Sequence, residues 1–223
     1  MNKGYIIDLD GTLIDSMALW DNLGRYYLQE LNITPSDDLN ERLAVLSIDK
    51  AIDYLINEYS LKETKTAIYQ QLNNLLAKLY QNEVTLKPGV VKFLTQCKNH
   101  HKKLCLLTAN TKTITNIILN KYQLTNYFDL IITCDDTKLD KQIGNIYQEA
   151  ADKLKLDKKD CIVIEDAYHA IKTAKDAGFT VWAVADHSNQ TSWSKICKIS
   201  DKHFKSMSEM EDSNEKSINN CRL

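Results

Sequence analysis

Hydrophobic residues follow two different patterns along this chain. Between residues 16 and 82 they recur every three or four positions, most clearly over 20–31, 48–59 and 68–79. This spacing places the apolar side chains on one face of an α-helix. The block therefore predicts a four-helix element.

Outside that block, short and continuous apolar runs alternate with amphipathic segments. Runs of this length and composition are typical of strands that are buried on both faces. Their alternation with helices predicts an α/β fold with a doubly wound parallel sheet. The predicted strands are 5–7, 104–107, 130–132, 161–164 and 181–185.

The order of these patterns predicts the domain organisation. Because the first strand precedes the helical block and the other strands follow it, the block is an insertion after strand one. We expect a core from residues 1–15 and 83–205, an inserted helical cap domain from 16–82, and a polar C-terminal tail from 206–223. The tail is rich in charged residues, and we expect it to be partly disordered.

Composition narrows the class of partner. Hydrophobic residues make up 43% of the chain and charged residues 26%, which is ordinary for a folded globular protein. The 28 basic and 30 acidic residues leave a net charge of -2, so we expect neither nucleic acid nor a membrane as a partner. The apolar run at 5–7 is too short for a signal peptide, and the 6 cysteines form no C-x-x-C pair. We expect a cytoplasmic monomer with reduced thiols and a small-molecule substrate.

Polar residues directly follow several of the predicted strands. Because the carboxyl ends of parallel strands meet at one edge of a sheet, these residues are expected to converge there. Carboxylates near an apolar core are costly unless a cation offsets their charge, so a divalent metal is the simplest explanation. The residues are Asp8 and Asp10 after the first strand, Thr108, Ala109 and Asn110 after the second, Glu165 and Asp166 after the fourth, and Lys141 between the third strand and its helix.

The donor types and their spacing favour magnesium and a phosphate group. Oxygen donors without imidazole or thiolate select a hard cation, and Mg²⁺ typically accepts a phosphate oxygen beside a few carboxylates. Asp8 and Asp10 project to the same side of an extended chain, roughly 6 to 7 Å apart. One carboxylate can then attack phosphorus while the other transfers protons. Thr108 and Lys141 can stabilise charge on the transferred oxygens.

Three stretches and one lysine resemble the motifs of the haloacid dehalogenase-like hydrolase superfamily. The run DLDGTLIDS at 8–16 is similar to its first motif, LLTAN at 106–110 to the second, Lys141 to the third, and VIEDAYHAIKTAKDAGF at 163–179 to the fourth. The likeness extends to about residue 205. It implies a Rossmann-like core with a helical cap inserted after strand one, as in the β-phosphoglucomutase and phosphoglycolate phosphatase branch.

The resemblance also implies roles for the acidic residues. It makes Asp8 the nucleophile that accepts the phosphoryl group and Asp10 the general acid and base. Magnesium would be bound by Asp8, by the main-chain carbonyl of Asp10 and by Asp166. Glu165 would be an outer or assisting ligand. Dehalogenases of the superfamily lack the second aspartate, so Asp10 favours phosphoester hydrolysis.

The phosphate would be held by Thr108 and Lys141, with Ala109 and Asn110 nearby. Here the chain departs from the family pattern. Where relatives read K-P-x-P-D after the third strand, this chain reads KQIGN at 141–145 and lacks both prolines. Lys138 is therefore an alternative to Lys141, although the register of the helix that begins at 145 favours Lys141.

These features together predict a Mg²⁺-dependent phosphatase that hydrolyses a small phosphorylated metabolite through an aspartyl phosphate. A sugar-phosphate mutase of the β-phosphoglucomutase kind is the alternative. Such mutases supply a histidine and an arginine from the cap, where this chain offers Trp20 and residues 45–47. That difference favours the phosphatase. A more remote alternative is a protein that binds a phosphorylated ligand without catalysis.

Overall fold

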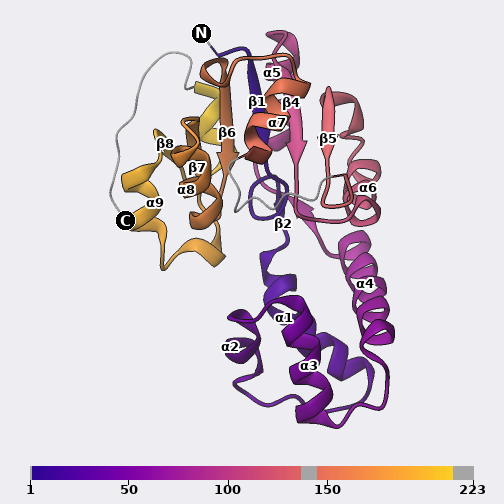
Figure 1. The fold of residues 1–223 in the computed structure, drawn as a ribbon. Coiled ribbons are helices and arrows are strands. Elements are labelled where there is room, and N and C mark those ends of the chain that lie inside the picture. Colours follow the sequence, from indigo (N-terminus) through magenta and orange to yellow (C-terminus); the bar gives the residue numbers. More distant parts are fainter. Residues whose placement is uncertain (1, 137–144, 213–223) are drawn as a thin grey trace. The chain divides into compact units, whose positions relative to one another are not determined.

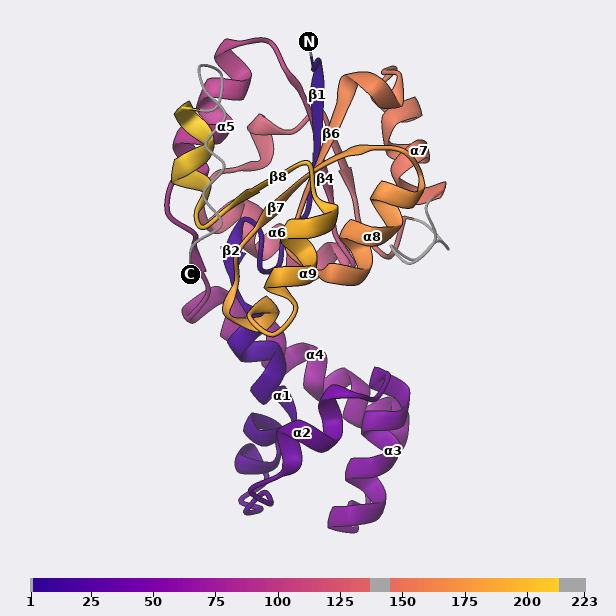
Figure 2. The ribbon, with the colours of Figure 1, turned by 90° about the vertical axis from the view of Figure 1, so that its left-hand side faces the viewer.

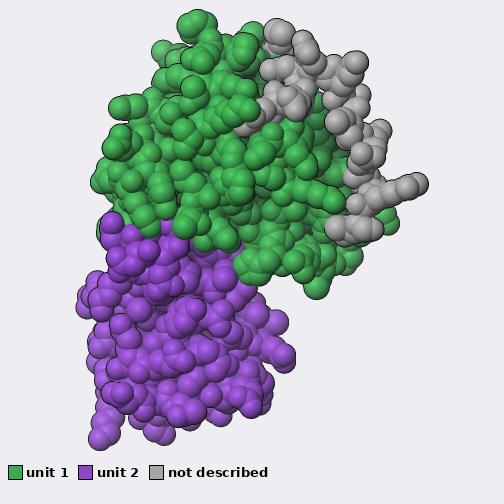
Figure 3. Space-filling view, turned by 180° about the vertical axis from the view of Figure 1, so that it is seen from behind, with its two compact units in different colours: residues 1–15, 85–223 green, residues 16–84 purple. Residues whose placement is uncertain are grey.

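The computed structural model describes residues 2–136 and 145–212. The chain divides into two compact units (Figure 3). Unit 1 combines Met1–Asp15 with Thr85–Leu223, and unit 2 is Ser16–Val84. The first unit contains the sheet, and the second is helical.

Unit 1 is built on a six-stranded sheet in the order β5-β4-β1-β6-β7-β8, in which all neighbouring strands are parallel (Figure 1). The central strand β1 is the first in the chain and pairs with β4 and β6, so Tyr5 lies opposite Leu104 and Ile162. The doubly wound α/β fold is therefore confirmed. The strands are β1 (Gly4–Ile7), β4 (Lys103–Leu107), β5 (Leu130–Ile132), β6 (Cys161–Glu165), β7 (Thr180–Val184) and β8 (Lys202–Phe204).

The strand β8 is not among those expected from the sequence. It pairs with β7 at the edge of the sheet, and only one of its side chains, that of Phe204, is buried. A three-residue edge strand has no continuous apolar run, so its pattern does not stand out in the sequence.

Helices cover both faces of this sheet (Figure 2). Apolar residues of α7 (Asn145–Lys153), α8 (Tyr168–Asp176) and α9 (Trp193–Ile199) pack against one face in a single buried cluster. On the other face, Tyr5 contacts Phe93 of α5 (Val90–Asn99) edge to face, with ring centroids 5.4 Å apart. The helix α6 (Lys112–Lys121) follows β4, and 3₁₀ turns η1 (Thr125–Tyr127), η2 (Lys158–Asp160) and η3 (His187–Asn189) complete the connections.

The start of the expected polar tail is ordered. Residues Met207–Asp212 form the 3₁₀ helix η4, which contacts α5. Met207 and Met210 of this segment are buried, and a Cβ on Gly89 would overlap Ser208. The two methionines therefore hold this segment against unit 1, although its charged composition predicts a solvent-exposed tail.

Unit 2 contains four α-helices, as predicted: α1 (Met17–Glu30), α2 (Leu39–Ala44), α3 (Ile48–Tyr59) and α4 (Lys65–Asn82). Its core joins α1 to α4, and Trp20 donates a hydrogen bond of 2.7 Å from Nε1 to the hydroxyl of the buried Tyr80. A short antiparallel pair of strands in unit 1, β2 (Ile14–Asp15) and β3 (Thr85–Leu86), joins the two ends of this insertion. Within the described ranges, no helix is both long and apolar enough to cross a membrane.

Candidate active site

The strand β1 delivers Asp8 to the carboxyl edge of the sheet. The main-chain N–H of Asp8 donates to the carbonyl of Ile164 at 3.0 Å, which continues the pairing of β1 with β6 beyond the last strand residue. The Asp8 side chain is buried. Its position is therefore set by the central strands of the sheet and not by a loop.

After Asp8 the chain turns sharply. The carbonyl of Leu9 accepts hydrogen bonds from the N–H groups of Leu13 and Ile14, at 2.9 and 3.1 Å. Gly11 has a φ of +79°, and a Cβ at this position would overlap the carboxylate of Asp166. Glycine is thus required here both by the backbone conformation and by the close approach of the acidic side chain.

The end of β6 brings two more acidic residues to the same place. Glu165 and Asp166 are buried, and one carboxylate oxygen from each lies within 4.8 Å of the others and of an oxygen of Asp8. The hydroxyl of Thr12 donates to Oδ1 of Asp166 at 3.1 Å. Three of the four predicted metal-binding residues therefore converge through their side chains. The expected contribution of the fourth, Asp10, is its main-chain carbonyl.

One oxygen of Glu165 has a structural task as well. Its Oε2 accepts hydrogen bonds from the main-chain N–H groups of Asp166 and Ala167, at 2.8 and 2.9 Å. These groups lie at the start of α8, where negative charge is favourable. The Glu165 side chain thus fixes the turn that presents Asp166.

The electrostatics of this cluster favour a bound cation. Burial, followed by the negative charges of Glu165 and Asp8, raises the pKa of Asp166 well above its ordinary value of 3.8, whereas Lys87 lowers it. A divalent ion would offset the repulsion that disfavours the ionised form. The donors are carboxylate oxygens, the type that Mg²⁺ prefers, so the residues present fit this ion.

The residues after β4 lie beside Asp10. The side-chain amide of Asn110 donates to Oδ2 of Asp10 at 2.5 Å, and the main-chain N–H of Asn110 donates to the buried Thr108 hydroxyl at 3.1 Å. Ala109 between them is exposed. Lys141 and its alternative Lys138 lie in 137–144, outside the described residues.

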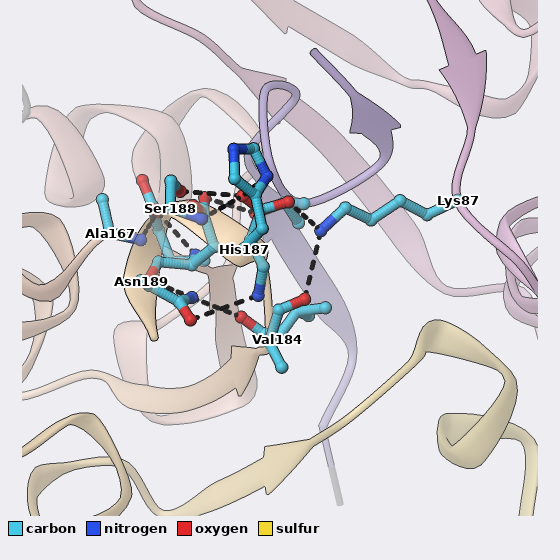
Figure 4. Close-up of polar contacts among 11 residues, drawn as sticks. Lys87, Ala167, Val184, His187, Ser188 and Asn189 are labelled. Carbon is cyan, nitrogen blue, oxygen red and sulfur yellow. Dashed lines mark hydrogen bonds and ion pairs between the residues drawn. The ribbon is translucent and has the colours of Figure 1, made fainter. Parts of the chain in front are cut away.

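A polar network that the sequence did not predict lies at the end of the neighbouring strand β7 (Figure 4). The Lys87 ammonium lies 2.6 Å from Oδ2 of Asp186 and donates to the carbonyl of Ala185 at 3.1 Å. Oδ1 of Asp186 accepts from the main-chain N–H and the hydroxyl of Ser188, at 2.9 and 2.8 Å. Burial acts to raise the pKa of Asp186, but its bonds from Lys87 and Ser188 outweigh burial and lower it. Asp186 directly follows the predicted strand at 181–185, so its position in the sequence could have placed it at the carboxyl edge of the sheet.

Comparisons with known proteins identify the family of this chain. The family model for haloacid dehalogenase-like hydrolases matches residues 5–184. A phosphorylated carbohydrates phosphatase of Thermotoga maritima is 23% identical over 176 residues, which cover 79% of this chain and 82% of that protein. A β-phosphoglucomutase of Bacillus subtilis is 25% identical over 185 residues, covering 79% and 80%.

The fold is shared with solved structures. That of a candidate β-phosphoglucomutase from Thermotoga maritima superimposes with a TM-score of 0.84 at 20% identity, covering 98% of this chain and all of that one. The resemblance drawn from the motifs is thereby confirmed. Since the family model spans most of its length, this chain belongs to the haloacid dehalogenase-like hydrolases.

Proposed function

We propose that this chain is a Mg²⁺-dependent phosphatase that hydrolyses a phosphomonoester of a small metabolite. The observation that carries the proposal is the meeting of Asp8, Glu165 and Asp166 oxygens within 4.8 Å at the carboxyl edge of the sheet. The phosphatase among the relatives acts, by its name, on phosphorylated carbohydrates, and we extend that substrate class to this chain.

Asp8 is the nucleophile in this proposal. Its carboxylate oxygen attacks the substrate phosphorus, and the bond from phosphorus to the leaving oxygen breaks, which forms an aspartyl phosphate. Water then attacks the same phosphorus, and the bond to Asp8 breaks to release inorganic phosphate. The main chain of Asp8 continues β1 and pairs with β6, so its buried side chain can hold the in-line geometry that both displacements need.

Asp10 transfers the protons. As a carboxylic acid it protonates the leaving oxygen, and as a carboxylate it then accepts a proton from the attacking water. The hydrogen bond from Asn110 supports this role because it restricts the rotation of the Asp10 side chain. Asn110 would then serve the phosphate site mainly through Asp10.

The metal would be held by the carboxylates of Asp8 and Asp166 and the main-chain carbonyl of Asp10, with Glu165 assisting. When bound, Mg²⁺ offsets negative charge on the carboxylates and on the phosphate oxygens. The Thr12 hydrogen bond and the close contact with Gly11 restrain the Asp166 side chain for this task.

The phosphate would be held by Thr108 and Lys141, with Ala109 and Asn110 nearby. The Thr108 oxygen accepts a hydrogen bond from the N–H of Asn110, so its own proton can be donated to a phosphate oxygen. Lys141 would contribute a positive charge from the segment that follows β5.

A sugar-phosphate mutase is the second candidate, because a β-phosphoglucomutase is among the relatives. It would use the same aspartyl phosphate and differ only in the acceptor, which is a sugar hydroxyl instead of water. The third candidate is a protein that binds a phosphorylated ligand without turnover.

One experiment separates the three. The purified chain is incubated with a panel of sugar phosphates, with Mg²⁺ or with EDTA, and inorganic phosphate and isomerised sugar are both measured. We expect Mg²⁺-dependent phosphate release. Isomerisation of β-glucose 1-phosphate that needs a bisphosphate primer would favour the mutase. Tight binding by calorimetry without either product would favour the non-catalytic candidate.

A further inference from the structure

The side chain of Asn189 connects the carboxyl ends of two neighbouring strands (Figure 4). Its Nδ2 donates to the carbonyl of Asp166, just after β6, and to the carbonyl of Val184, the last residue of β7, both at 3.0 Å. Its Oδ1 accepts from the N–H of Asp186 at 3.2 Å. Asn189 is only 4% exposed, and both of its side-chain N–H groups and its side-chain oxygen bind main-chain groups inside the protein.

This side chain restrains a residue that repulsion would otherwise displace. One carboxylate oxygen of Asp166 lies within 4.8 Å of oxygens of Asp8 and Glu165, and like charges at this distance repel one another. A shift of the main chain at Asp166 would relieve this repulsion and spoil the convergence of the three carboxylates. Thr12 holds the side chain of Asp166, and Asn189 holds its carbonyl.

Asn189 is itself held by the network described above. Asp186 caps the η3 turn, in which the Asp186 side chain accepts from Ser188 while the Asn189 side chain accepts from Asp186. The Lys87 ammonium pairs with Asp186, and both side chains are largely buried. The N–H of Lys87 donates to the carbonyl of Leu13 at 3.0 Å, in the turn that follows Asp10. The support of Asn189 therefore extends to the β1 turn.

We infer that Asn189 is a positioning residue for the metal site: by holding the main chain of Asp166, it sets the carboxylate geometry that binds Mg²⁺. The inference rests on the proposed function. Asn189 would affect the ion only through Asp166. Loss of an outer partner of a metal ligand typically weakens metal affinity about 10- to 100-fold, and we expect an effect in this range.

The test is a calorimetric titration of the purified full chain with Mg²⁺ alone, which measures the Kd for the ion. The variants are Asn189→Ala, which removes all three bonds, and Asn189→Ser, whose hydroxyl can replace one. The matched control is Asp201→Ala. Asp201 accepts from the N–H of Val181 at 2.7 Å, near the opposite end of β7 from Asn189. Asp201→Ala therefore removes a side-chain bond to the same strand, together with the ion pair between Asp201 and Lys175 at 2.8 Å, at the end of β7 away from the carboxylates.

We expect the Kd for Mg²⁺ to rise at least about tenfold in Asn189→Ala and by less in Asn189→Ser. The control should lose thermal stability and keep the wild-type Kd. A folded Asn189→Ala protein with a Kd within twofold of wild type would overturn the inference. If Asn189→Ala does not fold, the Kd of Asn189→Ser is measured instead: a rise of more than twofold supports the inference, and a smaller change overturns it. A wild-type chain that binds no Mg²⁺ would instead refute the proposed function.

Discussion

The side-chain amide of Asn110 donates a hydrogen bond to the carboxylate of Asp10, which joins residues 100 positions apart in the chain. The two residues follow neighbouring strands, β1 and β4, so the pairing of those strands brings them together. The contact ties the proposed general acid and base to the loop that carries Thr108. The motif implies only that Asn110 lies near the phosphate, whereas the structure shows that its side chain contacts Asp10.

Replacing Asn110 by alanine should lower kcat by roughly 10- to 100-fold, because Asp10 then loses the contact that orients it and proton transfer is worth about 10² to 10⁴ in rate. KM should change less, since Thr108 is retained. Steady-state kinetics on a sugar phosphate would measure both constants. A rise in KM with unchanged kcat would show instead that Asn110 acts mainly in phosphate binding.

Asp8→Asn should abolish turnover and leave the fold intact, because the substitution removes the nucleophile at nearly constant volume. Without Mg²⁺ the variant should unfold at a temperature no lower than wild type, since Asp8 is one of the charges that oppose Asp166. Phosphate release and thermal unfolding would test the two halves of this prediction. Residual activity near the wild-type level would refute the role of Asp8.

The raised pKa of Asp166 predicts the pH dependence of stability without metal. Between the ordinary value of 3.8 and the raised value, the folded state binds more protons than the unfolded chain. The contribution of this group to stability therefore falls as pH rises through that interval. Asp166→Asn cannot ionise, so in EDTA it should be more stable than wild type at pH 7, with a difference that narrows toward pH 4.

Urea denaturation at a series of pH values would measure this difference in the free energy of unfolding. Mg²⁺ should stabilise the wild-type protein and leave Asp166→Asn almost unaffected, because a ligand stabilises only the state that binds it. A difference between the two proteins that stays constant from pH 4 to pH 7 would contradict the prediction.

Gly11→Ala should reduce both stability and activity. An alanine at a φ of +79° costs about 1 to 2 kcal/mol in backbone strain, and its Cβ would also displace the Asp166 carboxylate. Gly178→Ala is the matched control, because its φ is +84° but its added Cβ would meet only the flexible end of Lys158. The control should lose stability alone. Equal kcat in both variants would show that the contact between Gly11 and Asp166 has no functional role.

Lys87→Met should destabilise unit 1 by about 3 kcal/mol, because it removes the lysine partner of the buried Asp186 carboxylate. The Lys87 and Asp186 side chains are 11% and 2% exposed. The exposed pair of Lys172 and Asp176 on α8 provides the control, and Lys172→Met should change stability by less than about 1 kcal/mol. Denaturant titration would compare them. Equal losses would mean that the buried pair contributes no more than a surface pair.

Local patterns in the sequence determined most of the architecture. Continuous apolar runs correspond to β1, β4, β5, β6 and β7, and helical spacing over 16–82 corresponds to the four helices of unit 2. These signals work because a strand or helix that buries apolar area must repeat its side chains with its own period. The acidic residues of the site could be identified for a related reason, since each one ends or follows a buried strand at the edge where ligands bind.

Only the tertiary structure decided which distant groups meet. Lys87 and Asp186 form an ion pair although they are far apart in the chain. Asn189 donates to the carbonyl of Asp166 from a 3₁₀ turn, and no hydrophobic periodicity in the sequence predicts that turn. The strand β8 and the η4 segment likewise depend on partners already in place, a sheet edge and the helix α5. Apolar periodicity records burial along one element, whereas hydrogen bonds and ion pairs between elements depend on the register and direction in which those elements pack.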